Sequence, residues 1–120
     1  MTAEKPVGMG CMRLSDLPVA DAQAVLRAGI ESGVTLLDTA RAYGQRPGDN
    51  ERLLAETLPP DHGLTVVTKC GMSRPRGQWV PDGRGRSIVA DCEASLEALQ
   101  TGCLDVLLLH AVDPKVAIET

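Results

Sequence analysis

Thr35-Leu36-Leu37-Asp38-Thr39-Ala40-Arg41-Ala42-Tyr43-Gly44 is the stretch of sequence that decides the fold. An apolar run over residues 34–37 ends abruptly at Asp38, and Tyr43 follows shortly after it. An apolar run this short, without polar alternation, predicts a strand that is buried on both faces, as strands of parallel sheets are. Asp38 would then lie at the carboxyl end of its strand, where α/β folds bind their ligands.

The same pattern occurs twice more along the chain. The apolar run over residues 64–68 leads into Lys69, and the run over residues 104–109 leads into His110. A further strand is predicted within residues 7–12. Asp38 and Lys69 are 31 residues apart, and Lys69 and His110 are 41 residues apart. These intervals suit strand–helix–strand units of about 30 residues or more. The sequence therefore predicts an α/β fold of parallel β/α units.

Helices are predicted between these strands. Asn50 is expected to cap a helix over residues 51–58, and Ser87 a helix that ends before Gly102. The pair Asp113-Pro114 has the signature of a fourth helix start. The first helix, with Ser15-Asp16 as candidate caps and Gly33 as its stop, has an apolar stripe of Ala22, Leu26 and Ile30.

The longest irregular stretch, residues 72–86, carries four arginines around Trp79. Such a loop can be a functional lid or a mobile insertion, and arginines that flank a tryptophan can indicate phosphate binding or base stacking. A solvated loop pinned by one aromatic side chain is the commoner case, so we expect a loop near the mouth of the site. In residues 8–10 the pattern G-x-G is a weak signal for a phosphate loop, and a strand end with a tight turn explains it at least as well.

Composition excludes several classes of function. The net charge is −4 with both signs interspersed, which argues against a nucleic-acid partner. The four cysteines are far apart and form no C-x-x-C pair, so we expect no metal site. We expect reduced thiols, a cytoplasmic location and no membrane association, because the polar amino terminus is unlike a signal peptide and no run of about 18 apolar residues occurs.

If the strands are adjacent and parallel, Asp38, Lys69 and His110 emerge at one end of the sheet, and Tyr43 can fold back among them. A free phenol titrates near about pH 10, but an adjacent ammonium stabilises the phenolate and eases proton donation. Asp38 would hold Lys69 charged, and His110 could orient a substrate oxygen. Taken singly, each residue has an ordinary structural explanation: a cap, a solvent-facing strand end, a structural histidine or a packing residue. Together they suit protonation of a carbonyl oxygen while its carbon gains a hydride.

These residues resemble the aldo-keto reductase family. The resemblance runs through Gly8-Met9-Gly10-Cys11-Met12, residues 33–40 and 42–44, Asn50-Glu51, Val67-Thr68-Lys69, residues 95–99 and residues 104–110. It implies a (β/α)8 TIM barrel that reduces aldehydes or ketones with NADPH.

By the same resemblance Tyr43 is the general acid, Lys69 and Asp38 tune it, and His110 orients the carbonyl substrate. The resemblance also implies that Gly10, Cys11 and Met12, together with Asp38, bind the cofactor near its nicotinamide.

Such a barrel typically needs about 250 residues. Residues 1–120 are therefore expected to be its amino-terminal half, with about four β/α units, either as a truncated reading of a longer gene or as a half-barrel. We expect the isolated chain to bind NADPH weakly or not at all, and to associate with itself or with a missing carboxy-terminal half. The alternative is a non-catalytic interaction module that uses the open half-barrel face.

Overall fold

A computed structural model describes residues 5–120; residues 1–4, part of the polar amino terminus considered above, lie outside the described residues. The elements along the chain are β1 (Gly8–Gly10), the 3₁₀ helix η1 (Met12–Asp16), α1 (Val19–Glu31), β2 (Leu36–Asp38), α2 (Asp49–Thr57), β3 (Thr65–Cys70), β4 (Met72–Ser73), the 3₁₀ helix η2 (Pro75–Gly77), β5 (Val80–Pro81), α3 (Gly85–Ala98) and β6 (Val106–Leu109).

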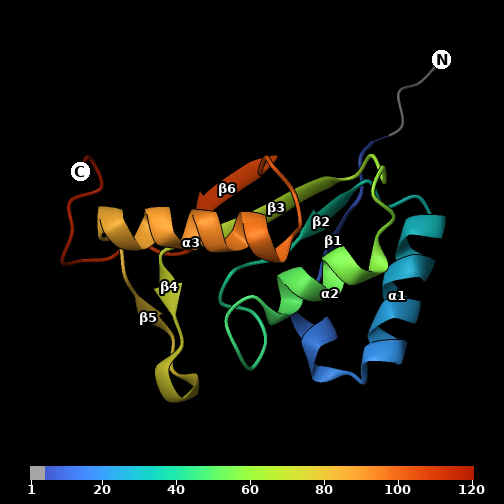
Figure 1. Cartoon of the computed structure of the whole chain (residues 1–120), viewed down its shortest axis with the longest axis horizontal. Coiled ribbons are helices and arrows are strands. Elements are labelled where there is room, and N and C mark those ends of the chain that lie inside the picture. Colours follow the sequence, from blue (N-terminus) through green and yellow to red (C-terminus); the bar gives the residue numbers. More distant parts are fainter. Residues whose placement is uncertain (1–4) are drawn as a thin grey trace.

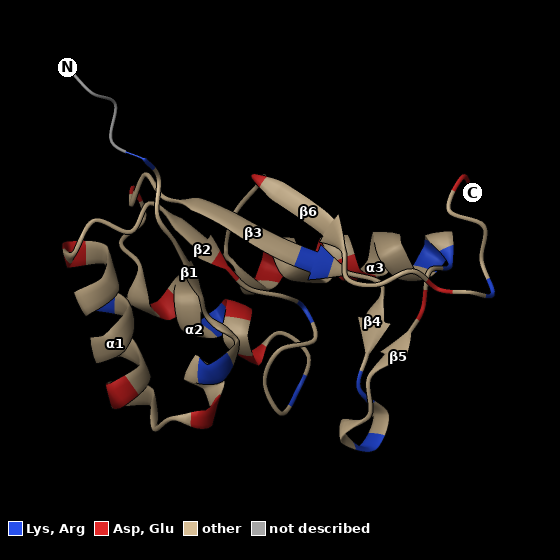
Figure 2. Cartoon of the chain, turned by 180° about the vertical axis from the view of Figure 1, so that it is seen from behind, with Lys and Arg blue, Asp and Glu red and all other residues tan. Residues whose placement is uncertain are grey.

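The main sheet has four strands in the order β1-β2-β3-β6, and every neighbouring pair is parallel. The three α-helices lie on one face of this sheet, as the front and rear views agree (Figures 1 and 2). We call this the helix face, and the opposite one, which no described helix covers, the open face. The prediction of an α/β fold with parallel β/α units is confirmed.

Strand alternation assigns each side chain to one of these faces. Leu37 packs with the helices in the hydrophobic core, and Thr68 donates a hydrogen bond to Glu51 of α2, so both lie on the helix face. Their neighbours Asp38 and Lys69 therefore project from the open face. The alternation that buries the core thus directs these two charged groups away from it.

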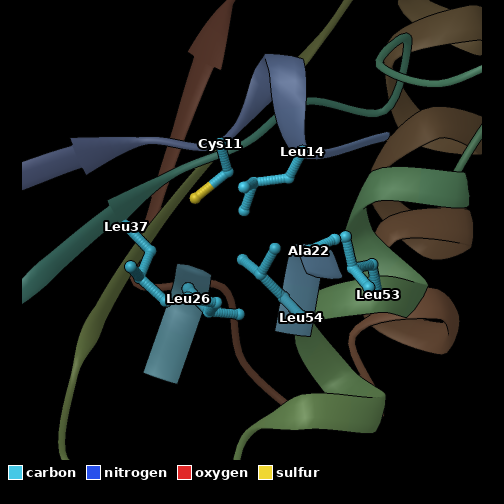
Figure 3. Close-up of a cluster of buried hydrophobic side chains, with 7 residues drawn as sticks. All are labelled: Cys11, Leu14, Ala22, Leu26, Leu37, Leu53 and Leu54. Carbon is cyan, nitrogen blue, oxygen red and sulfur yellow. The ribbon is translucent and has the colours of Figure 1, made fainter. Parts of the chain in front are cut away.

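A compact group of apolar side chains fills the space between the sheet, η1, α1 and α2 (Figure 3). We call it the leucine core. Leu26, Leu37 and Leu54 are fully buried within it. Burying a leucine side chain contributes about 1.5 to 3 kcal/mol, so this group accounts for much of the packing energy of the chain. Its members are Cys11, Leu14, Ala22, Leu26, Leu37, Leu53 and Leu54.

The predicted N-terminal caps of the helices are wrong. The helix α2 is preceded by Gly48 in a left-handed conformation (φ 83°), and Asn50 lies inside the helix. The helix α3 starts at Gly85, so Ser87 is also inside its helix, where its hydroxyl donates to Asp82. Ser15-Asp16 belongs to η1, and α1 begins after Pro18. Asn50, Ser15 and Ser87 make tertiary or local hydrogen bonds instead of capping a helix.

Two further expectations need correction. Residues 72–86 are not an irregular loop: β4 and β5 pair as an antiparallel hairpin, with η2 at its tip. No fourth helix follows Asp113-Pro114, since residues 114–120 form turns. The Asp113 carboxylate accepts from the amide of Lys115 as a cap would, but its other oxygen accepts from the amide of Gly83. The described residues thus hold three complete β/α units and a fourth strand.

The prediction that the strands are buried on both faces is wrong for β6. Val106 is 37% exposed and Leu108 44% exposed, because nothing among residues 5–120 covers the open face beside them. All four residues of β6 are apolar, yet only part of the surface of the strand is removed from water.

Candidate active site

Lys69 forms the centre of the candidate site. Its ammonium donates hydrogen bonds to Asp38 Oδ1 at 2.8 Å and to the carbonyl of Thr39 at 2.8 Å. It also lies 3.2 Å from the phenolic oxygen of Tyr43. The Lys69 side chain is mostly buried whereas that of Asp38 is about one-third exposed. The carboxylate therefore holds the ammonium in place at the edge of the open face, directly beside the phenol.

The loop between β2 and α2 brings Tyr43 back to the sheet. The Arg41 amide donates to the carbonyl of Lys69 at 3.1 Å, which continues the β2–β3 pairing beyond the strand. The Tyr43 amide then bonds the carbonyl of Ala40 at 3.2 Å and closes a turn. Gly44 follows with φ 102°, a conformation that favours glycine. Tyr43 is therefore almost completely buried, at 8% exposed.

His110 reaches the same rim from β6. Its amide donates to the carbonyl of Cys70 at 2.9 Å, so the residue continues the strand pairing. Its ring meets the Tyr43 ring edge-on, with centroids 5.6 Å apart. Burial, and then the nearby Lys69 ammonium, lowers the pKa of His110 below its ordinary value, while Asp38 opposes this effect. The imidazole is therefore neutral at physiological pH, and its Nδ1 is buried without a hydrogen-bond partner.

The β4–β5 hairpin places Trp79 against the site, where the sequence predicted only a loop near the site mouth. The Trp79 ring lies 5.5 Å from the His110 ring and 6.4 Å from the Tyr43 ring, measured between centroids. The Arg74 guanidinium stacks 4.2 Å over Trp79 and donates to the carbonyl of Gly44. The signal in the sequence was that Trp79 is the single tryptophan. A cavity of about 440 Å³ opens here, lined by Met12, Arg13, Asp16, Gly44, Gln45, Arg74, Gly77 and Trp79.

The segment expected near a cofactor divides in two. Gly10 is exposed at the end of β1, beside Asp38 in the strand register, and Met12 is 42% exposed. Cys11 differs, because its side chain is fully buried in the leucine core (Figure 3). Burial raises the pKa of its thiol to about 11. The expectation that Cys11 contacts a cofactor needs correction, since its side chain, amide and carbonyl all have partners inside the protein.

Sequence reasoning missed the part played by Asn50 and Glu51, both fully buried at the start of α2. Asn50 bonds Cys11 after β1, Ser15 of η1 and Thr39 after β2, and Glu51 bonds Thr68 of β3. A signal was available: Asn50 lies three and four positions before Leu53 and Leu54, so it falls on the apolar stripe of its helix. A polar residue on that stripe indicates a buried hydrogen-bonding group.

Other features of the described residues lie apart from this rim. A second cavity, of about 290 Å³, lies near the start of β3; His62 and Asp105 line it, and both accept backbone amides there. Residues 5–120 contain no group of three side chains that could hold a metal ion. All four cysteines are free. No helix in the described part of the chain is long and apolar enough to cross a membrane. Acidic and basic residues are interspersed (Figure 2).

With this geometry in place, comparison with known proteins identifies the family. Residues 6–120 match the model of the aldo/keto reductase family, so the chain belongs to that family of NADP-dependent oxidoreductases. The match extends over all the described strands and helices. The earlier resemblance is therefore confirmed.

Solved structures of this family share the fold. An aldo-keto reductase from Bacillus halodurans, in its holo form, is 29% identical with a TM-score of 0.82, over 94% of this chain and 38% of that one. A putative aldo-keto reductase from Pseudomonas aeruginosa is 28% identical with a TM-score of 0.77, over 91% and 43%. A glycerol dehydrogenase from Gluconobacter oxydans is 25% identical with a TM-score of 0.79, over 91% and 36%. The chain thus spans about two fifths of the length of these relatives.

Proposed function

We propose that this chain carries the catalytic groups of an NADPH-dependent reductase of aldehydes or ketones. The observation that carries the proposal is the placement of the Lys69 ammonium, 3.2 Å from the Tyr43 phenol and 2.8 Å from the Asp38 carboxylate. A phenol is a weak acid by itself, and a fixed positive charge beside it stabilises the phenolate that remains after proton transfer. Tyr43 is accordingly the general acid, and Lys69 with Asp38 tunes it.

His110 has the complementary role. Because its pKa is lowered, mainly by burial, the ring is neutral and does not compete with Tyr43 as proton donor. A neutral imidazole still has one N–H, which can donate a hydrogen bond to a carbonyl oxygen and orient it. The perpendicular contact with the Tyr43 ring keeps the imidazole beside the phenol, so both can reach the same carbonyl group.

The end of β1 fits a flat cofactor ring. A side-chain carbon added at Gly10 would meet nothing within 4 Å, so the space above this backbone is open. Gly10 lies beside Asp38 in the strand register, and we assign these two residues and Met12 to the nicotinamide side of NADPH. When bound, NADPH supplies the hydride that reduces the carbonyl carbon. The residues of this chain orient the carbonyl group and deliver the proton from the Tyr43 hydroxyl to its oxygen.

The open face needs a cover for this function. We propose that a segment equivalent to the rest of the relatives' length pairs with it, either in the same polypeptide or as a separate partner. The four free thiols support a reducing compartment such as the cytoplasm. Reading the DNA downstream of the codon for Thr120 tests whether the covering segment belongs to the same polypeptide. An in-frame continuation with four more strand–helix units would show that it does, and would give a longer protein in which the open face is covered.

The acid role is tested by Tyr43→Phe in that longer protein. The variant keeps the aromatic ring and loses the proton, so turnover of an aldehyde should fall by about 100-fold or more, followed as loss of NADPH absorbance. The melting temperature should stay within a few degrees, roughly, of the parent value, because the ring contacts remain. Unchanged turnover would remove Tyr43 from the acid role.

Titration of NADPH into the 120-residue chain, followed by the fluorescence of the cofactor, tests whether NADPH binding needs the further segment that we propose to cover the open face. We expect no saturation in the micromolar range, since the resemblance to the family implies that most contacts to the phosphates and the adenine come from segments outside these 120 residues. Micromolar binding by the monomer would contradict this expectation.

The exposed apolar side chains of β6 favour one alternative, a non-catalytic module that works by pairing its open face with a partner. Sedimentation of the 120-residue chain at increasing concentration measures whether this face associates. Association of the chain, together with no carbonyl reduction by the longer protein, would favour the interaction module over the enzyme.

A further inference from the structure

We propose that Asn50 and Glu51 are positioning residues, which fix from the helix face the strand ends that carry the candidate catalytic groups on the open face. We call this buried pair with its hydrogen bonds the α2 brace. The proposal rests on the proposed function for its meaning, but the structural effect can be measured without activity.

Asn50 connects three chain segments at once. Its amide nitrogen donates to the carbonyl of Cys11 at 2.8 Å and to the hydroxyl of Ser15 at 2.7 Å. Its amide oxygen accepts the hydroxyl of Thr39 at 2.6 Å. Thr39 directly follows Asp38, and its own carbonyl accepts the Lys69 ammonium. One side chain therefore holds the end of β1 and the end of β2 at a fixed separation.

Glu51 performs the same task for β3. Its Oε1 accepts the hydroxyl of Thr68 at 2.6 Å, and both side chains are fully buried. Thr68 and Lys69 are adjacent in β3, so they point to opposite faces of the sheet. Fixing Thr68 on the helix face consequently fixes the backbone from which Lys69 extends toward Tyr43.

The energetic cost of Glu51 supports a positional role. Its second oxygen, Oε2, is buried without a hydrogen-bond partner, and the nearest cation, Arg41, is 3.6 Å away. Burying a carboxylate with incomplete pairing is unfavourable, and an apolar side chain of similar size is often equally stable or better. An apolar residue would fill this space but could not hold the Thr68 hydroxyl at 2.6 Å.

His110 provides a reporter for the position of Lys69. The Lys69 ammonium is the second cause, after burial, of the lowered pKa of His110. The test is an NMR pH titration of the His110 ring in the 120-residue chain, compared among the parent, Thr68→Val, Thr68→Ser and Lys69→Met. Thr68→Val has nearly the shape of the parent and loses only the hydroxyl, whereas Thr68→Ser keeps the bond to Glu51.

We expect Lys69→Met to raise the pKa of His110 and Thr68→Val to raise it in the same direction by a smaller amount. Thr68→Ser should restore the parent value. Thr39→Val, which removes the Asn50 bond instead, should also raise it, because the carbonyl of Thr39 helps to hold Lys69. This fourth variant keeps the test decisive if Thr68→Val does not fold. The ring signals of His62, near the start of β3, monitor folding in every sample.

A lower melting temperature in both valine variants with an unchanged pKa of His110 would overturn the proposal, since the brace would then only add stability. The titration needs neither cofactor nor turnover. A raised pKa of His110 in the valine variants, together with no carbonyl reduction by the longer protein, would support the α2 brace and reject the reductase function. An unchanged pKa together with carbonyl reduction would reject the brace and support the reductase function.

Discussion

The two faces of the four-stranded sheet contain similar residues in very different surroundings. On the helix face, Leu37 is fully buried between α1 and α2; on the open face, Leu108 is 44% exposed. Both are leucines in short apolar strands of the same sheet. The difference shows that strand sequence determines which side chains can be buried, and that the covering layer determines which of them are.

The candidate active site lies at the boundary between these faces. Asp38 and Lys69 project from the open face, while the residues beside them in sequence, Leu37 and Thr68, are buried on the helix face. In such a site the buried residues of the helix face hold the strands in place, and the charged groups on the open face remain accessible to a ligand. Four predictions test the comparison.

Truncating a leucine on each face should give the largest difference. Leu37→Ala leaves a cavity in the leucine core and should lower the free energy of unfolding by about 2 to 5 kcal/mol. Leu108→Ala, the matched control, removes a side chain that is already half in water and should cost less than about 1 kcal/mol. Urea unfolding of the 120-residue chain measures both. Equal losses would show that the open face is covered in solution.

Two glycines extend the comparison to the backbone. Gly44 has φ 102°, and an added Cβ would lie 2.5 Å from the Cβ of Asp49 in α2. Gly77, at the hairpin tip, has φ 78° with open space around it. Gly77→Ala should cost about 1 kcal/mol for the left-handed backbone alone, and Gly44→Ala about 2 to 3 kcal/mol because the clash is added. Similar melting temperatures for the two variants would argue against the close packing of the Tyr43 loop.

The pH dependence of stability should report on His110. Because burial and Lys69 lower its pKa in the folded state, the unfolded chain binds this proton more readily. The free energy of unfolding should therefore decrease as the pH falls below about 6.5, the ordinary value for histidine, and this contribution should be fully present above it. His110→Gln should flatten the dependence between about pH 5 and pH 7. A slope unchanged by the substitution would mean that another group causes it.

The smallest effect is expected for an ion pair that belongs to neither face. Arg13 and Asp16 are 2.8 Å apart on η1, but their side chains are 83% and 61% exposed. Water and salt screen such a pair, so Arg13→Ala should change the free energy of unfolding by less than about 0.5 kcal/mol. The same urea series measures it, and a larger loss would indicate that Arg13 has a partner beyond Asp16.

The sequence predicted well whatever depends on local pattern. Four apolar runs gave the four parallel strands, and polar residues where three of these runs end indicated where a site would lie. It failed where a side chain has several possible partners. Asn50 has the right type and position for a cap, yet it bonds Cys11, Ser15 and Thr39, none of which is near it in sequence. Cys11 was assigned to the cofactor because the family segment contains it, but its thiol packs into the leucine core.

The sequence by itself determined the order of strands and helices and the residue types available at the strand ends, because hydrophobic periodicity and turn chemistry act over a few residues. Only the tertiary structure decided that the amine of Lys69 reaches the phenol of Tyr43, that Trp79 closes the site from a hairpin, and that β6 stays partly in water. Those outcomes depend on how distant segments compete for the same space and the same hydrogen bonds, which no local pattern contains.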